Sequence, residues 1–254
     1  MILNMRKLLD DLKWQIEAGI DVTIGDKPNN KFYQEEGNNQ NHTNENSSKS
    51  SEIFENNSLN DELKTIKTLE ELKKILKENN FCNLQKSSKN LIFSDGDSNS
   101  NIMVISNNPD SSEDNLGKPL VEKNGELFNN ILSAAGLSRS SVYITPVIPW
   151  KIPGERDLTL DEKNTLLPIL KKHIEIINPK ILVLLGKTAL NAIVGQETII
   201  SKARGKWHQK EIGSTKLWVM ASFHPAFLMR QPEQKKLAWI DLKMIRDKSK
   251  TLKI

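Results

Sequence analysis

Two short polar segments contain the side chains best suited to chemistry. Asn107 and Asn108 follow the apolar run 102–105, and His224 follows the apolar run 217–221. An imidazole can donate a hydrogen bond, and an amide side chain can orient a water molecule. A lone histidine is more often a hydrogen-bonded structural residue, and that alternative stays open. If the two segments lie at neighbouring strand ends, they place a donor and a water-orienting amide at one site.

Four apolar segments, each leading into a polar loop, are expected to position these side chains. They are residues 102–110, 141–147, 180–186 and 217–224. Helical patterns separate them, and strands that alternate with helices indicate a parallel, doubly wound sheet. Ligands of such sheets bind at the carboxyl ends of the strands. We therefore expect an α/β fold, three-layer αβα with a central, mostly parallel four-stranded sheet.

Local signals predict where some elements begin and end. Thr68 with Glu71, and Thr159 with Glu162, have the spacing of capping boxes and predict two helix starts. Residues 90–93 are apolar enough for an edge strand. The first helix start and the edge strand precede residues 102–110, and the second helix start lies between residues 141–147 and 180–186.

The composition divides the chain into three parts. Residues 1–27 are expected to contain an amphipathic helix, because leucine and isoleucine recur there at helical spacing. Residues 28–60 are rich in Asn, Ser, Glu and Gln, a composition that does not offset the entropy of ordering, so we expect a disordered linker. Residues 61–254 are then the folded domain.

Bulk properties exclude several classes of protein. The 254 residues are 37% hydrophobic, enough for a core, but no apolar run approaches the roughly 20 residues of a membrane-spanning helix. The N-terminus lacks the apolar core of a secretory signal, so we expect a cytoplasmic protein. Cys82 is the single cysteine, which excludes an intrachain disulfide. The net charge of +4 permits a polyanionic partner without demanding one.

One apparent phosphate-binding motif fails on its spacing. Gly186, Lys187 and Thr188 match the last three letters of a phosphate loop. The glycine that the motif requires five positions earlier is Ile181, inside an apolar run. We interpret the segment as a tight strand-to-helix turn, which can still present amide groups to a DNA phosphate.

The order and spacing of these segments resemble the uracil-DNA glycosylase superfamily, most closely its bacterial family-four-like branch. The resemblance runs from about Leu69 to Arg246 and rests on an ordered set of short motifs. They are Ser106-Asn107-Asn108-Pro109-Asp110, Glu113-Asp114, Gly117-x-Pro119-Leu120-Val121, Tyr143-Ile144-Thr145-Pro146, Ile152-Pro153-Gly154-Glu155-Arg156, Leu184-Leu185-Gly186-Lys187-Thr188-Ala189 and His224 to Arg230.

The resemblance implies a DNA glycosylase that flips a uracil or another deaminated base out of DNA and hydrolyses its N-glycosidic bond. Asn108 or Asn107 would orient the water, and His224 would donate to the base oxygen. The resemblance further implies a base pocket of Ser106, Pro109, Leu120 and Pro146 and a wedge of Leu228, Met229 and Arg230. From their charge, we also expect Arg156 and Lys187 to contact DNA phosphates.

Three residues depart from the family pattern at positions to which the family assigns a role. Asn107 stands at the family's water-positioning glutamate, Leu120 at its stacking phenylalanine, and Pro146 at the asparagine that reads the pyrimidine edge. An amide cannot take a proton from water, and proline has no side-chain donor or acceptor. Pro146, together with the polar Ser106 and Asp110 that replace loop glycines of the family, supports the alternative, a catalytically impaired DNA-binding member of the same superfamily. A third option is a nucleotide- or sugar-phosphate-binding enzyme that uses the same crevice.

The expected cofactors and partners follow from the same comparison. The family's iron–sulfur cluster needs four cysteines, whereas only Cys82 lies near a ligand position here, and Trp150 and Leu167 occupy the places of two later ligands. We therefore expect no cluster, no metal and no other cofactor. DNA is the expected partner, without membrane association, and we expect a monomer.

Overall fold

Four short runs of apolar residues form the interior of one sheet. The computed structural model describes residue 59 and residues 61–195 and 198–254. Its interior strands are β3 (Tyr143–Pro146), β2 (Ile102–Ser106), β4 (Ile181–Leu185) and β6 (Thr215–Ser222), in that spatial order. Each is parallel to its neighbours in this group. All residues of β2, β3 and β4 are buried, as expected of parallel strands covered on both faces.

The predicted number of strands was wrong, because the described residues form a mixed sheet of six strands. β1 (Asp95–Gly96) pairs antiparallel with β3 at one edge, and β5 (Trp207–Ile212) pairs antiparallel with β6 at the other. β1 has only two residues, and it follows the segment 90–93, where an edge strand was predicted. β5 is mostly polar and lacks the apolar run that identified the interior strands.

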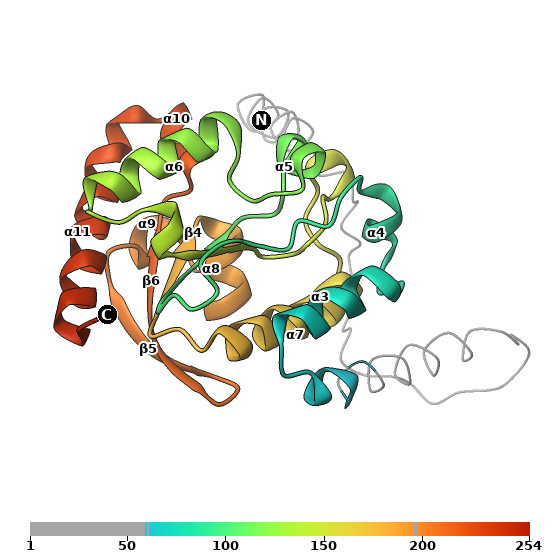
Figure 1. Ribbon diagram of the computed structural model, residues 1–254. Helices are drawn as coiled ribbons and strands as arrows, with labels where there is room; N and C mark the ends of the chain where they lie inside the picture. The colour runs from blue at the N-terminus through green and yellow to red at the C-terminus, as the bar shows by residue number, and fades with distance from the viewer. Residues whose placement is uncertain (1–58, 60, 196–197) are drawn as a thin grey trace, which may run out of the picture. The chain divides into compact units, whose positions relative to one another are not determined.

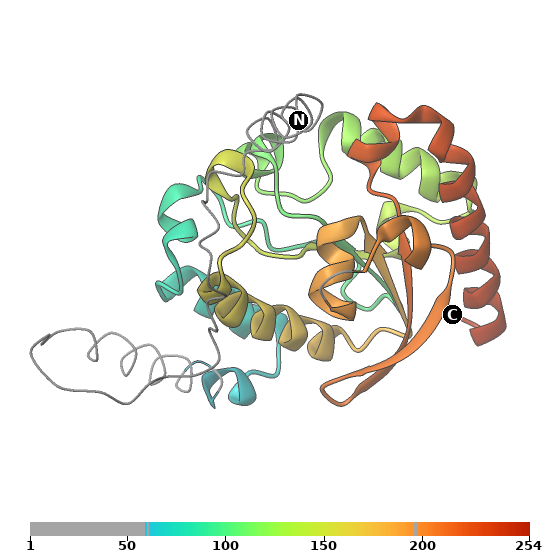
Figure 2. The same cartoon turned by 180° about the vertical axis from the view of Figure 1, so that it is seen from behind.

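Helices cover both faces of the sheet, which gives the predicted three layers. Side chains that alternate along β2 and β4 pack on opposite faces. Val104 and Val183 belong to one apolar cluster with α6 (Glu122–Ala134) and α11 (Lys235–Leu252), whereas Ile105 belongs to another. The second cluster includes residues of α3 (Leu69–Glu78), α7 (Leu160–Ile177) and α8 (Lys187–Val194). Figures 1 and 2 show α6 and α11 on one side of the sheet and α3 and α7 on the other.

Shorter elements complete the described chain. They are α4 (Asn83–Ser87), α5 (Ser111–Leu116), α9 (Ile200–Ala203) and α10 (Pro225–Arg230), with 3-10 turns at η1 (Arg139–Ser141), η2 (Pro153–Glu155) and η3 (Pro232–Gln234). Both predicted capping boxes are confirmed. Thr68 Oγ1 accepts from the backbone N–H of Glu71 at 3.2 Å, and Thr159 Oγ1 accepts from that of Glu162 at 3.2 Å.

Two predicted parts of the chain fall outside this description. The amphipathic helix in residues 1–27 and all but Leu59 of the linker in residues 28–60 lie outside the described residues. Of the helices that are described, none is both long and apolar enough to cross a membrane.

Candidate active site

The carboxyl ends of three adjacent strands bring the predicted catalytic segments together. β4 lies between β2 and β6, so Gly186 lies between the loop that starts at Asn107 and the segment that contains His224. Gly186 has a φ of +93°, and a Cβ atom on it would stand 2.7 Å from Asn107 Oδ1. Glycine therefore serves two needs here, because it adopts a left-handed conformation and lets the Asn107 amide approach the backbone closely.

The two adjacent asparagines have different surroundings. Asn108 lines a groove of about 890 Å³ together with residues of α7, α8 and the loop that precedes α7, whereas Asn107 packs against Gly186. The Oδ1 atoms of both are buried, and neither has a hydrogen-bond partner among the described residues. Buried amide oxygens normally accept a hydrogen bond, so contacts within the described residues do not account for the orientation of these two side chains. Of the two residues, only Asn108 lines the groove, and its Oδ1 is turned away from the open space.

His224 is a partly buried histidine at the start of α10. Its Nδ1 accepts a hydrogen bond from the backbone N–H of Ala226 at 3.2 Å, so in the neutral ring the proton lies on Nε2. Burial lowers the pKa of His224 to about 4, with Arg230 acting in the same direction and the charge of Asp110 opposing it. The imidazole is therefore a neutral donor near pH 7.

A buried carboxylate connects the β2 loop to the proposed base pocket. Glu113 is 5% exposed; its Oε2 accepts from the backbone N–H of Asp110 at 2.8 Å, and its Oε1 accepts from that of Leu120 at 2.5 Å. Burial raises the pKa of Glu113 to about 7, although both backbone hydrogen bonds lower it. The sequence analysis did not assign Glu113 a role. Its spacing from Asp110 was a usable signal, because the two form a capping box at the start of α5.

Replacing Glu113 by glutamine is expected to destabilise both loops. A glutamine amide has one acceptor oxygen, so its NH₂ group would face one of the two backbone N–H donors. We expect the free energy of unfolding to fall by about 1–3 kcal/mol, the cost of leaving a buried donor unpaired. Chemical denaturation measures this loss, and Glu126→Gln, an exposed change on α6, is the control. Equal stability of the two variants would contradict the role given to Glu113.

The four residues predicted to line the base pocket are all buried. Ser106 and Pro146 are register partners at the ends of β2 and β3, and Pro109 follows in the β2 loop. Leu120 is 1% exposed and adopts a φ of +50°. Arg139 holds the backbone around it, donating to the carbonyl of Leu120 at 3.0 Å. These four residues are therefore packed in the interior, and none of them lines the groove beside Asn108.

The residues predicted to contact DNA differ in exposure. Lys187, Met229 and Arg230 are exposed. Arg156 forms a bidentate ion pair with Glu162, at 2.7 and 2.6 Å. The structure does not place Leu228 at the surface: it is 0% exposed and packs in an apolar cluster with neighbours of α6 and α11. In α10 the successive residues Leu228 and Met229 point in different directions, Leu228 into the interior and Met229 outward.

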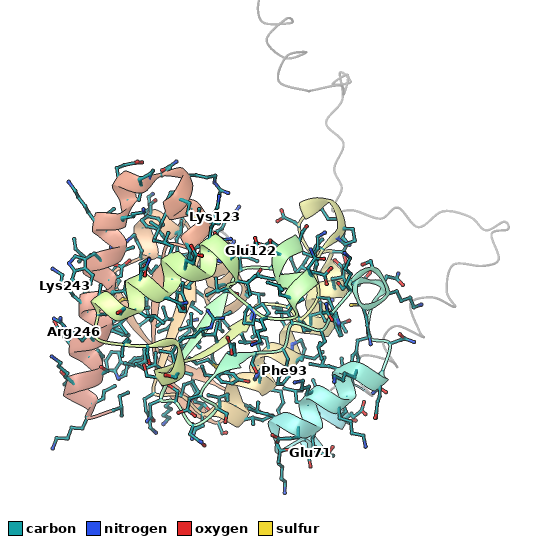
Figure 3. All side chains as sticks on the ribbon, turned by 45° about the horizontal axis from the view of Figure 1, so that its top comes forward. Glu71, Phe93, Glu122, Lys123, Lys243 and Arg246 are labelled. Atoms are coloured by element: carbon teal, nitrogen blue, oxygen red, sulfur yellow. The ribbon has the colours of Figure 1, made fainter. Side chains whose placement is uncertain are left out.

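Further basic side chains lie on the helices next to α10. Lys123 is in the first turn of α6, which contacts α10, and Lys235 and Lys236 begin α11. Figure 3 shows Glu122 and Lys123 at the start of α6 and Lys243 and Arg246 on α11. The sequence analysis singled out none of these lysines, because their proximity to α10 depends on helix packing.

The fold and these loops define an α/β protein whose candidate catalytic groups gather at the carboxyl ends of parallel strands, the usual ligand position in this class. The chain belongs to the Uracil DNA glycosylase superfamily, whose family model matches residues 93–243.

Curated relatives support the same assignment. The chain is 34% identical over 171 residues to a Type-4 uracil-DNA glycosylase of Thermotoga maritima, covering 64% of this chain and 86% of the relative. It is 32% identical over 168 residues to one of Archaeoglobus fulgidus, covering 65% and 84%. A third, of Pyrobaculum aerophilum, is 30% identical over 168 residues, covering 65% and 86%.

The residues of this chain do not fit the iron–sulfur cluster that the family resemblance implies. Such clusters are held by four thiolates, and the chain has one cysteine. Cys82 is partly buried against the core, and burial raises the pKa of its thiol. Trp150 is 2% exposed in the same apolar cluster, and Leu167 packs against it. Within the described part of the chain, no group of three or more His, Cys, Asp or Glu residues could hold a metal ion.

Proposed function

We propose that this chain is a uracil-DNA glycosylase, which hydrolyses the bond between uracil and deoxyribose C1′ in DNA. Membership of the superfamily and the names of the relatives support this function. The observation that carries the proposal is the position of a neutral His224 next to the loop of Asn107 and Asn108. A donor and a water-orienting amide then lie at the same edge of the sheet, on either side of β4.

The proposed chemistry needs charge stabilisation more than proton transfer. When the bond to C1′ breaks, its electron pair moves to the base, and negative charge develops on the base oxygen. The Nε2–H of His224 donates to that oxygen, an interaction that strengthens as the charge grows. Asn108 orients the water that attacks the positively polarised C1′. An amide does not accept the proton of the water, so its contribution is orientation; the base leaves as an anion, and the water releases its proton to solvent as the C1′–O bond forms. No step uses a cofactor.

The wedge is proposed to consist of Met229 and Arg230. Flipping a base out of a duplex costs a few kcal/mol, and an apolar side chain inserted into the stack offsets part of that cost. Met229 is 41% exposed at the end of α10, and Arg230 follows it toward the phosphates. Leu228 supports the wedge from the interior.

Replacing Met229 by alanine is expected to slow excision from duplex DNA about three- to tenfold and to leave single-stranded DNA unaffected, because only the duplex must be unstacked. The ratio of single-turnover rates on the two substrates measures this. Leu160→Ala, an exposed leucine at the start of α7, is the control. A uniform loss on both substrates would remove Met229 from the wedge.

An excision assay tests the function directly. Oligonucleotides with uracil, hypoxanthine or xanthine at one position, single-stranded and duplex, are incubated with the protein, and alkali-labile sites are measured. We expect uracil to be released from both forms. DNA binding without release of any base would instead identify the catalytically impaired alternative.

The proposal also covers the binding partner, the oligomeric state, the location in the cell and the domain boundary. DNA is the partner, the chain acts as a monomer in the cytoplasm, and residues 61–254 form the glycosylase domain behind the predicted helix in residues 1–27 and the linker in residues 28–60. Light scattering of the protein in solution tests the monomer, and activity of a variant that begins at residue 59 tests the domain boundary.

A further inference from the structure

An ion pair is buried beside the end of β6, the strand that leads to His224. Asp241 on α11 is 0% exposed, and both of its carboxylate oxygens accept hydrogen bonds from Arg204, the residue after α9. The bond from Arg204 Nε to Asp241 Oδ2 is 3.0 Å long. Arg204 also donates to the carbonyl of Leu237 at 2.7 Å. The proposed reaction assigns no role to either member of the pair.

A contribution to stability does not account for this pair. Taking two charges out of water is costly, and replacing a buried ion pair by apolar residues often leaves stability unchanged or raises it. The cost is visible here, because burial raises the pKa of Asp241 although the hydrogen bonds from Arg204 and Ser222 lower it. What a pair of this kind can supply is one specified arrangement of the elements that it joins.

The side chains of both residues that precede His224 contact the ion pair. Ser222 Oγ donates to Asp241 Oδ2 at 2.7 Å, and Ser222 is 3% exposed. The guanidinium carbon of Arg204 lies 5.5 Å from the centroid of the Phe223 ring, within the range of a cation–π interaction. The segment that ends β6 is therefore held at two successive side chains.

The backbone next to Arg204 supports the same geometry. Gly205 has a φ of +66°, and a Cβ atom on it would stand 2.9 Å from Asp241 Oδ1. Its N–H donates to the carbonyl of Ala221 at 3.3 Å. Glycine therefore lets the chain after α9 approach the carboxylate and the strand at the same point.

We propose that Arg204 and Asp241 are positioning residues for the glycosylase reaction: through Ser222 and Phe223 they fix the end of β6 and thereby the direction of the Nε2–H of His224. The proposal rests on the proposed function, because its effect on catalysis requires that His224 donate to the base oxygen. A misplacement of about 1 Å in a catalytic site can cost about 10²-fold in rate, so a fixed strand end has a measurable value.

Ser222→Ala tests the connection without removing a charge, because Arg204 still pairs with Asp241. We expect single-turnover excision at saturating protein to fall about tenfold, less than the effect of a 1 Å misplacement, because the contact with Phe223 remains. The Kd for DNA should change less than about twofold, because the positioned donor acts in the transition state.

Ser249→Ala is the matched control. Ser249 is a buried serine of α11, 5% exposed, whose Oγ donates to the carbonyl of Arg246 at 2.8 Å. Its replacement also removes one buried hydroxyl hydrogen bond, but none of its contacts leads to His224. We expect a similar loss of Tm in the two variants and an unchanged excision rate in Ser249→Ala.

A double variant separates positioning of His224 from a general loss of structure. In the His224→Ala background, Ser222→Ala should cause no further loss of rate, because the residue through which it acts is absent. Asp241→Asn, which leaves Arg204 buried without its charge partner, should lower the rate at least as much as Ser222→Ala, and again only when His224 is present. An unchanged rate in Ser222→Ala, or an equal loss in the presence and absence of His224, would overturn the proposal.

A spectroscopic measurement decides the proposal if the unmodified protein excises no uracil. The ¹⁵N chemical shifts of the His224 ring report which nitrogen carries the proton, and the bond from the N–H of Ala226 assigns it to Nε2. A changed Nδ1 shift in Ser222→Ala, absent from Ser249→Ala, would support positioning of the ring while the glycosylase function is rejected. Identical ring shifts in the two variants would reject the positioning as well.

Discussion

Replacing His224 by alanine is expected to lower the rate of uracil excision about 10²- to 10³-fold, the usual effect of removing one donor from a site of developing negative charge. The backbone contact of its Nδ1 orients the ring, and its Nε2–H is left to serve the base oxygen. We expect DNA affinity to change little, because the interaction strengthens in the transition state. Single-turnover excision and fluorescence anisotropy measure the two quantities.

His208→Ala is the matched control, because His208 is an exposed histidine on β5. It should excise uracil at the unmodified rate. If His224→Ala also excises at that rate, His224 is a structural residue, the alternative that the sequence left open. A loss of DNA affinity equal to the loss of rate would indicate that the histidine contacts DNA in the ground state.

The low pKa of His224 also predicts how the stability of the protein depends on pH. A histidine in the unfolded chain has a pKa of 6.5, whereas His224 in the folded protein has a pKa of about 4, so the unfolded chain binds more protons between these values. The contribution of His224 to stability is therefore present above pH 6.5 and is lost as the pH falls toward 4. His173, whose pKa burial lowers to about 3, acts in the same direction. The loss of Tm from about pH 7 to about pH 5 should be smaller in His224→Ala than in the unmodified protein.

Replacing Asn108 by alanine is expected to lower the excision rate about 10²-fold, the size of effect that mispositioning of a reactant has. Asn108 lines the groove, and its amide oxygen is buried without a partner among the described residues, so orienting a water there requires the side chain to turn toward the groove. Asn108→Asp should retain more activity than Asn108→Ala, because a carboxylate also orients water and can accept its proton. Single-turnover excision at saturating protein compares the variants.

Asn107→Ala separates the two asparagines. Its amide packs on Gly186, so we expect a smaller effect on excision than that of Asn108→Ala. If Asn107→Ala has the larger effect, the two roles are exchanged, and the water lies on the Gly186 side of the loop.

The sequence was sufficient where local patterns determine structure. Apolar runs identified the four interior strands, and their polar ends identified Asn107, Asn108 and His224. It was insufficient where structure depends on packing between distant elements. β5 is held by its pairing with β6 rather than by an apolar pattern, and a six-residue helix does not reveal which face holds Leu228.

Glu113 and the groove illustrate the same limit at the site. The capping spacing from Asp110 to Glu113 is visible in the sequence, but the bond to the N–H of Leu120 depends on a left-handed backbone seven residues away. The groove arises from three segments that are separate in the chain, so no local pattern identifies it.

Pro146 has a consequence for which lesions are repaired. It is buried at the end of β3, opposite Ser106. The family resemblance assigns this position to recognition of the pyrimidine edge, but the proline ring has no hydrogen-bond donor or acceptor. Discrimination between bases then depends in part on the stability of the base pair, because a mispaired base is flipped out at lower cost than a paired one. Uracil opposite guanine should therefore be removed faster than uracil opposite adenine, which would direct repair toward deaminated cytosine and away from uracil incorporated during replication.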